Sequence, residues 1–306
     1  MSKAYDRVNI YMLEASMHRL KLPHSFITFI RNLFTNRYNR IFTAHGITDK
    51  YHVLVGIDQG EVISPLLWCI YYDPLLSRLQ NMSNYNLTGY QLSHTWQPNL
   101  KTTENQTKSC NIPLTAFMDD SNWIADSIAK LENTLHITSS FNTLNDIQTN
   151  DDKAVLLTTK VPDNHEPIIL NVNSKQIAIK PISLHDSTRI LGVWLSAGKS
   201  NKYIFDQLKQ EIQQYCTILQ HKIVTDQQLL YIYNMVIIPR IEFRSQLVFL
   251  SKEQCNTLQA PFRILFKHKL KMAKNIPNAI LTNSFIYNFR DLYQVQMQSK
   301  FTNFLV

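Results

Sequence analysis

The chain has 306 residues, 44% of them hydrophobic, and its 31 basic residues outnumber the 23 acidic ones for a net charge of +8. This length and apolar content support a packed core in one large or two modest domains. The four cysteines are far apart and form no Cys-x-x-Cys pair, so neither a zinc site nor a disulfide framework is indicated, and reduced thiols are expected. The longest uncharged apolar stretch, residues 62–72, is too short to span a bilayer.

The first half of the chain predicts helices and one hairpin before a polar segment. Apolar spacing predicts helices at 6–20 and from Pro23 onward, and a hairpin of Arg40–Thr43 with Tyr51–Ile57 then leads to Gln59. Ser64 is predicted to cap a helix whose first residue is Pro65. Residues 80–111 are rich in Asn and Thr and predict a loop with a short strand at 88–92.

The second half predicts an α+β pattern that becomes wholly helical. We expect first a hairpin around Asp119 and then a helix from Ser127 to about Asn150, with Ile128 and Leu144 facing inward. Further short strands are expected after this helix. Those strands are 154–158, 168–172 with 176–179 as a hairpin, and 189–195. The change to helical spacing after Ser196 predicts one domain at 1–195 and a second, helical one at 196–306.

Two adjacent carboxylates, Asp119 and Asp120, interrupt the apolar run Leu114–Ala125. Buried like charges cost several kcal/mol unless a cation or hydrogen bonds compensate, so a divalent metal is one explanation. The alternative is a hairpin turn, since Asp, Ser and Asn are common turn residues.

Four other segments surround this pair in a fixed order and favour the metal. They are Met1–Val8, Gly56–Leu67 with its Gln-Gly and Ser-Pro dipeptides, Asn150–Lys153, and Arg189–Gly192. Together with Phe117–Asp120 they closely resemble motifs A to E of the reverse transcriptases of non-LTR retrotransposons, over about residues 1–195. The resemblance implies an incomplete polymerase palm, an antiparallel sheet with helices on one face, followed by a helical thumb-like region.

The resemblance also assigns roles to individual residues, each with a structural alternative. Asp119 and Asp120 would hold Mg²⁺ or Mn²⁺ for nucleotide addition, the alternative being a plain turn. Tyr5 matches the aromatic residue under the sugar of the incoming deoxynucleotide, or is an ordinary buried tyrosine. Gln59 and Gly60 match the nucleotide pocket, or form a turn without a ligand.

Later motifs add residues that contact the leaving group and the nucleic acid. Lys153 resembles the lysine that protonates departing pyrophosphate, or is a surface lysine paired with a neighbouring aspartate. Leu191 and Gly192 resemble the primer grip, or belong to a structural strand. Candidate phosphate contacts, for which a solvated helix face is the alternative, are Arg31, Arg37, Arg40, Arg263, Lys267, Lys269 and Lys271.

One departure governs the functional prediction. In the family, motif A begins with an aspartate before the position of Met1, and neither this residue nor the upstream fingers region is in the chain. We therefore interpret the chain as an N-terminally truncated fragment, inactive alone, of an enzyme that copies an RNA template from a DNA primer with deoxynucleoside triphosphates. The alternative is a non-catalytic nucleic-acid-binding remnant of the same fold. An intracellular, nuclear location is expected; no feature indicates a membrane or an oligomer.

Overall fold

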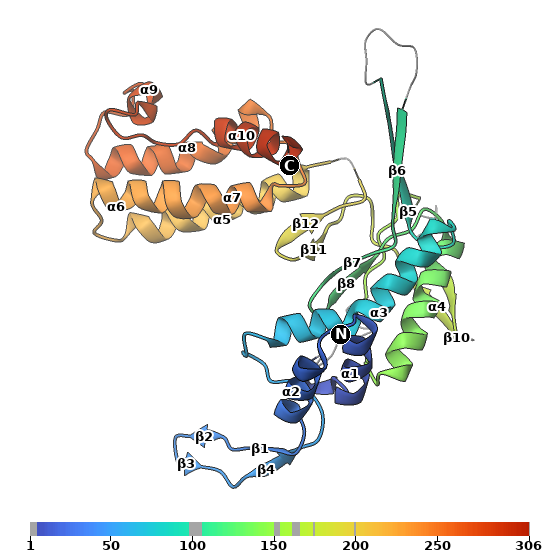
Figure 1. Cartoon of the computed structure of the whole chain (residues 1–306). Helices are drawn as coiled ribbons and strands as arrows, with labels where there is room; N and C mark the ends of the chain where they lie inside the picture. Colours follow the sequence, from blue (N-terminus) through green and yellow to red (C-terminus); the bar gives the residue numbers. More distant parts are fainter. Residues whose placement is uncertain are drawn as a thin grey trace. The chain divides into compact units, whose positions relative to one another are not determined.

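A computed structural model describes residues 5–97, 106–149, 154–160, 166–173, 175–198 and 200–305 (Figure 1). The fold is α+β, with helices and small antiparallel sheets, as the sequence predicts. It divides into two compact units, one of residues 1–154 with 168–179 and the other of 155–167 with 180–306. In the part of the chain that the structure describes, no helix is long and apolar enough to cross a membrane.

Among its described residues, the first unit has four α-helices. They are α1 (Ile10–Arg19), α2 (His24–Phe34), α3 (Ser64–Asn84) and α4 (Ile128–Leu144), preceded by the short 3₁₀ helix η1 (Tyr5–Arg7). The Asn9 side chain caps α1 by accepting hydrogen bonds from the N–H groups of Tyr11 and Met12. Their common core is apolar and aromatic, and includes Leu13, Ile30, Leu67, Trp68 and Tyr72.

Every sheet among the described residues has two antiparallel strands, so the single sheet expected for a palm is replaced by separate ribbons. In this unit β1 (Arg37–Asn39) pairs with β4 (Tyr51–Val53), and β2 (Phe42–Thr43) pairs with β3 (Gly46–Ile47). The other ribbons are β5 (Tyr90–Trp96) with β6 (Gln106–Ile112), β7 (Leu114–Phe117) with β8 (Asp120–Trp123), and β9 (Ile168–Val172) with β10 (Lys175–Ile179). The hairpin predicted around Asn173 is confirmed. Around residue 45 the chain does turn back, but the predicted pairing of 40–43 with 51–57 was wrong: Tyr51–Val53 pairs with Arg37–Asn39, and Phe42–Thr43 pairs with Gly46–Ile47.

Two predictions for this unit were wrong. The polar loop expected at 80–111 is largely the exposed hairpin of β5 and β6, whose Ser and Thr side chains suit a ribbon that is solvated on both faces. In α4, Ile128 and Leu144 are exposed, while Thr134 and Thr138 are buried. These hydroxyls are buried without penalty because each donates to the carbonyl four residues earlier.

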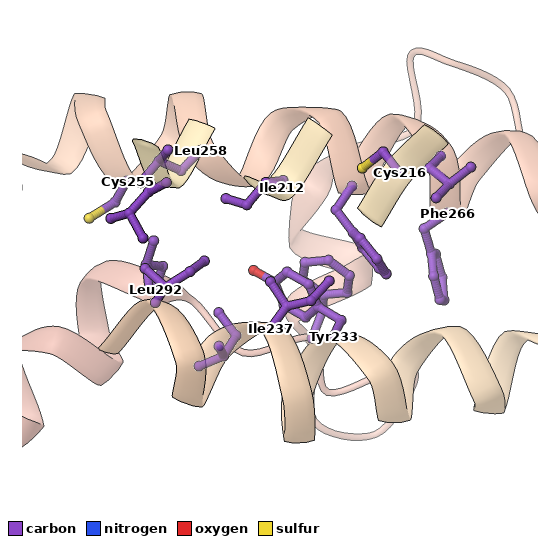
Figure 2. Packing of buried hydrophobic residues seen from close by; sticks show 14 of the residues in the cluster. Ile212, Cys216, Tyr233, Ile237, Cys255, Leu258, Phe266 and Leu292 are labelled. Carbon is purple, nitrogen blue, oxygen red and sulfur yellow. The ribbon is translucent and has the colours of Figure 1, made fainter. Parts of the chain in front are cut away.

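The second unit is mainly helical. Its helices are α5 (Lys202–Gln220), α6 (Asp226–Tyr231), the π-helix η3 (Ile232–Ile237), α7 (Ile238–Arg244), α8 (Lys252–Lys269), α9 (Asn278–Thr282) and α10 (Leu292–Leu305). Thr225 and Ser251 close capping boxes at the starts of α6 and α8. The buried side chains of α5, η3, α8 and α10 meet in one apolar core, around Ile212, Tyr233 and Phe266 (Figure 2).

Two of the strands predicted in the second half of the chain differ from the structure. The strand expected at 154–158 is reduced to one bridge, between Leu156 and Pro181. The single strand expected at 189–195 was also wrong: it is a tight hairpin of β11 (Thr188–Ile190) and β12 (Val193–Leu195). Leu191 and Gly192 turn the chain because both have positive φ, at 50° and 88°. This hairpin belongs to the second, helical unit.

Candidate active site

The two aspartates lie at a tight turn. Phe117 pairs with Asp120 across the β7–β8 ribbon, so Met118 and Asp119 alone form the connection. Met118 accommodates the turn in the left-handed region, with φ of 53°. Both carboxylates are exposed, so the desolvation cost that suggested a metal does not arise here, although a turn of this kind presents two oxygen donors side by side.

Tyr5 contacts this turn from the start of the chain. Its hydroxyl donates to Sδ of Met118 at 3.0 Å, and its ring meets Trp68 edge-on with the centroids 5.9 Å apart. Burial, followed by the nearby Cys69 and the negative charge of Asp119, raises the pKa of Tyr5 above its ordinary value. The hydrogen bond between Tyr5 and Met118 brings the first segment of the chain against the aspartate turn.

The glycine-rich loop before α3 lies against the same segment. The N–H of Gly56 donates to the carbonyl of Val8, and the N–H of Ile57 donates to the carbonyl of Tyr5, both at 2.9 Å. Gly56 has φ of 94°, and a Cβ there would stand 2.8 Å from the carbonyl oxygen of Asp6. Only glycine allows this approach of two backbones, so Gly56 is required by the packing of the loop against the first segment.

The residues predicted to contact the nucleotide follow in the same loop. Gln59 and Gly60 are both exposed. Gly60 also has φ of 94°, but its Cβ position is open, so the backbone turn alone requires glycine there. The loop therefore presents the Gln59 amide and the Gly60 backbone to solvent, on a segment anchored beside Tyr5.

Arg37 and Ser64 brace this loop from its two ends. Arg37, at the start of β1, donates to the carbonyl of Gly56 at 2.6 Å and forms an ion pair with Asp58 at 2.5 Å. The Ser64 hydroxyl donates to the carbonyl of Asp58 at 2.6 Å. Ser64 is thus the first residue of α3, not its cap, and its side chain holds the loop instead. The Arg37 guanidinium, 12% exposed, is engaged within the protein.

Helix α3 supports the aspartate turn with two aromatic side chains that sequence reasoning missed. Trp68 donates from Nε1 to the carbonyl of Met118 at 2.8 Å, and the Tyr72 hydroxyl lies 3.2 Å from Oγ of Ser121. The two rings stack with centroids 5.5 Å apart. The available signal was their spacing of four residues on the helix after Ser64-Pro65, which places both side chains on one face.

The donor set at the turn suits a hard divalent cation. Mg²⁺ is commonly bound by one or two carboxylates together with water and substrate phosphates, and Asp119 and Asp120 could supply the two. Among the described residues, no cluster of three or more His, Cys, Asp or Glu side chains could hold a metal. Any cation at this turn would therefore need oxygen ligands beyond these two residues.

The other predicted residues of the first unit are more dispersed. Lys153 lies outside the described residues. Arg31, on α2, pairs with Glu14 at 3.4 Å, and Arg40 is exposed between β1 and β2.

The predicted primer-grip residues form the turn of the β11–β12 hairpin. Leu191 is exposed, and a Cβ on Gly192 would stand 3.1 Å from the ring of Phe243 in α7. The turn is thus packed closely against the helical unit, which accounts for glycine at position 192 on structural grounds. A contact between Leu191 and a primer stays a prediction.

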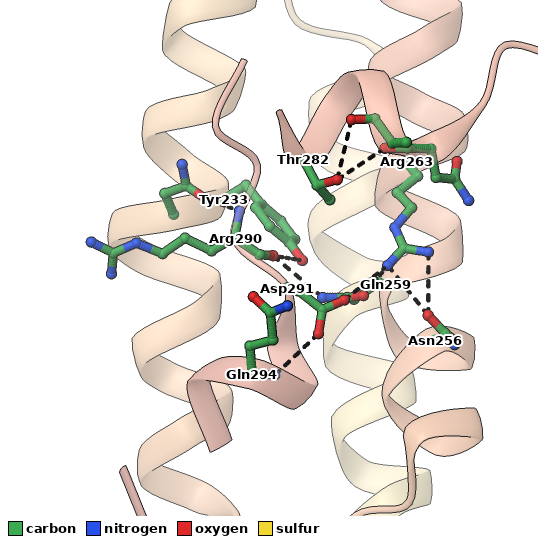
Figure 3. A network of polar contacts seen from close by, with 11 residues as sticks. Tyr233, Asn256, Gln259, Arg263, Thr282, Arg290, Asp291 and Gln294 are labelled. Atoms are coloured by element: carbon green, nitrogen blue, oxygen red, sulfur yellow. Dashed lines mark hydrogen bonds and ion pairs between the residues drawn. The ribbon is translucent and has the colours of Figure 1, made fainter. Parts of the chain in front are cut away.

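Three cations of the basic stretch 263–274 are engaged inside the helical unit. Arg263 donates to Gln259 and Asn256 and lies 3.8 Å from Asp291 (Figure 3). The Lys267 ammonium is buried and donates to the carbonyl of Ile276 at 2.7 Å and to Asn278 at 3.0 Å.

Lys269 and Lys271 are the other two predicted contacts in this stretch. Lys269 donates to the carbonyls of Gln220 and Lys222, both at 2.8 Å, and so joins the end of α8 to the end of α5. Lys271 is exposed. Phosphate contacts by Arg263, Lys267 or Lys269 would require these internal bonds to break.

Comparison with known proteins supports the motif assignment. Residues 1–195 match the reverse transcriptase (RNA-dependent DNA polymerase) family. The chain is also 26% identical over 139 residues to the retrovirus-related Pol polyprotein from type-1 retrotransposable element R2 of Popillia japonica. That similarity covers 45% of this chain and 20% of the relative, so the chain spans a small part of that polyprotein's length.

The chain belongs to the reverse transcriptase family, and within it to the non-LTR retrotransposon type. Family members use a nucleic-acid template and nucleotide substrates, and generally require divalent metals.

Proposed function

We propose that these residues are the palm and a helical thumb-like region of an enzyme that adds deoxynucleotides to a DNA primer on an RNA template. The observation that carries the proposal is the junction of Tyr5, the Gly56–Gly60 loop and the Met118–Asp119 turn. Three motifs that are far apart in sequence are joined there by backbone and side-chain hydrogen bonds.

The chain's own residues have distinct roles in this proposal. Asp119 and Asp120 would hold the divalent cation, which when bound would neutralise charge on the triphosphate and activate the primer hydroxyl. Tyr5, fixed by Met118 and Trp68, stands beside the nucleotide sugar and disfavours a 2′-hydroxyl by steric conflict. Gln59 offers a donor and an acceptor to the nucleotide, and Gly60 permits close approach of its backbone.

We further propose that the 306 residues alone do not extend a primer. Two-metal catalysis needs carboxylates from more than one strand, and the β7–β8 turn supplies only one side. Asp6 does not replace the other, because it lies in η1, with its backbone under Gly56. The complete protein would act in the nucleus, on a nucleic-acid duplex formed by its primer and template.

Primer extension on an RNA template tests this proposal. A longer polypeptide that adds the fingers region and an aspartate before Met1 should extend a labelled DNA primer, and the 306-residue chain should not. In the longer polypeptide, Asp119→Asn should abolish extension, whereas Asp206→Asn, an exposed carboxylate on α5, should leave it unchanged. Gln59→Ala should raise KM for the nucleotide more than it lowers kcat.

Two results would redirect the assignment. Robust extension by the 306 residues would mean that the cation is held elsewhere. Binding of primer–template by the longer polypeptide without any extension, in Mg²⁺ and in Mn²⁺, would favour the non-catalytic nucleic-acid-binding remnant.

A further inference from the structure

The hairpin of residues 37–53 carries an exposed aromatic and basic surface in the first unit, apart from the aspartate turn. Its strands β1 to β4 form a narrow ribbon extending from the helices of that unit (Figure 1). Phe42 is 82% exposed and Tyr38 is 58% exposed. Arg40 and Lys50 are exposed beside them, and the segment holds three basic residues against one acidic residue.

The rings on this hairpin are already arranged for stacking. Tyr38 and His52 are cross-strand partners, and their rings stack with centroids 4.8 Å apart and planes 22° from parallel. The Lys50 ammonium lies 5.4 Å from the centre of the Tyr38 ring. Such a flat aromatic surface with cations beside it suits a nucleic-acid strand. Every base has a π-face that can stack on the rings, and every phosphodiester linkage carries a negative charge that can pair with the cations.

The root of the hairpin is fixed to the nucleotide loop. Arg37 begins β1 and holds both Gly56 and Asp58, while β4 runs directly into the loop. An isolated two-stranded ribbon is marginally stable in water, so this brace is what orients the hairpin. A strand bound along the hairpin would be held next to the loop that presents Gln59.

We propose that the 37–53 hairpin is a binding site for single-stranded nucleic acid, in which bases stack on Tyr38, His52 and Phe42 while Arg40 and Lys50 contact phosphates. Unpaired strands are the favoured occupant because their bases are free to leave the stack and lie on protein rings. The site is separate from the aspartate turn and takes a different part of the nucleic acid. The proposal of this binding site rests on the proposed function only for which nucleic-acid strand of the polymerase reaction would occupy it.

The test is binding of a fluorescent oligothymidylate of about 12 nucleotides to the 306-residue chain in EDTA, followed by anisotropy. Tyr38→Leu, which keeps apolar bulk, should weaken binding roughly tenfold, because one base–aromatic stack is lost. Tyr38→Phe keeps the ring and should bind as the unaltered chain does. Tyr85→Leu is the matched control, since Tyr85 is 77% exposed in the same unit but outside the hairpin.

Two further probes separate stacking from charge. An abasic strand of the same length should bind weakly to the unaltered chain and should no longer distinguish Tyr38→Leu from it. Lys50→Gln and Arg40→Gln should each reduce the slope of log affinity against log salt by about 0.7, the value for one phosphate contact on a single strand. A duplex competitor of equal length should displace the oligothymidylate poorly.

Several results would overturn the proposal. These are no binding, equal affinity for abasic and thymidylate strands, or equal effects of Tyr38→Leu and Tyr85→Leu. A change in sedimentation of Tyr38→Leu without a change in oligonucleotide affinity would instead assign the hairpin to contact between copies of the chain. Because the assay needs neither metal nor nucleotide, its failure leaves the primer-extension test unaffected, and the reverse also holds.

Discussion

Replacing Trp68 with Phe tests whether α3 positions the aspartate turn. Trp68 is 2% exposed, stacks on Tyr72 and donates its indole N–H to the carbonyl of Met118. Phenylalanine keeps one aromatic ring in the core but removes the donor and leaves space where the second ring stood. The hydrogen bond contributes about 1 kcal/mol net, and the lost packing about 1–2 kcal/mol. We therefore expect the first unit to lose about 2–3 kcal/mol of stability.

Hydrogen exchange followed by mass spectrometry resolves this effect by unit. The peptide that covers 114–123 should exchange roughly 30- to 150-fold faster in Trp68→Phe, which corresponds to that loss of free energy. Peptides from α5 and α8, which belong to the second unit, should not change. Trp96→Phe makes the same chemical change on the exposed β5 strand, where it should cost under about 0.5 kcal/mol.

Equal exchange in Trp68→Phe and Trp96→Phe would refute the reasoning. It would mean that the Met118 carbonyl and the stacked rings contribute nothing to holding the turn. If exchange in the 114–123 peptide is faster but the urea midpoint is unchanged, the loss of stability is confined to the turn. That result would still agree with the prediction that α3 positions the turn.

Three further changes have expected outcomes. In urea unfolding, Gly56→Ala should destabilise the first unit by about 1–3 kcal/mol more than Gly60→Ala does. Both residues have the same φ, but only at Gly56 would the added Cβ collide with backbone atoms, those of Asp6. Equal effects of the two substitutions would contradict this. Burial raises the pKa of Cys216 and Cys255 from an ordinary 9.0 to about 11. As pH rises, these thiols ionise in the unfolded chain before they ionise in the folded one. The free energy of unfolding should therefore fall between pH 9 and about 11, by up to about 1.4 kcal/mol per pH unit for each thiol. A constant free energy of unfolding over that range would exclude the effect. Lys267→Met should destabilise the second unit by about 2–3 kcal/mol, because the acceptors of its ammonium lose their partner. The salt dependence of oligonucleotide binding should not change. A smaller slope of log affinity against log salt would show that Lys267 contacts a phosphate after all.

The sequence was most informative where a local rule and an ordered set of motifs agreed. Asp119 and Asp120 were predicted to lie at a hairpin, and the structure places them at the β7–β8 turn, which contacts Tyr5 through Met118. The change to a helical second unit was also evident, because helical periodicity persists through long segments there. These features follow from residues near one another in sequence, or from motif order, and need no knowledge of packing.

Other features were decided only by the tertiary structure. Charge alone made Arg263, Lys267 and Lys269 candidates for phosphate contact, but carbonyls and amides engage their donors. The partners of Arg263 and Lys267 lie in α8 or in the segment that follows it, and those of Lys269 lie at the end of α5. Likewise, Thr134 and Thr138 face the core because hydroxyls can be satisfied within their own helix, which leaves apolar Ile128 outside. Composition and periodicity describe what a side chain prefers, whereas the partners that satisfy it, in its own helix or in another element, are set by the folded structure.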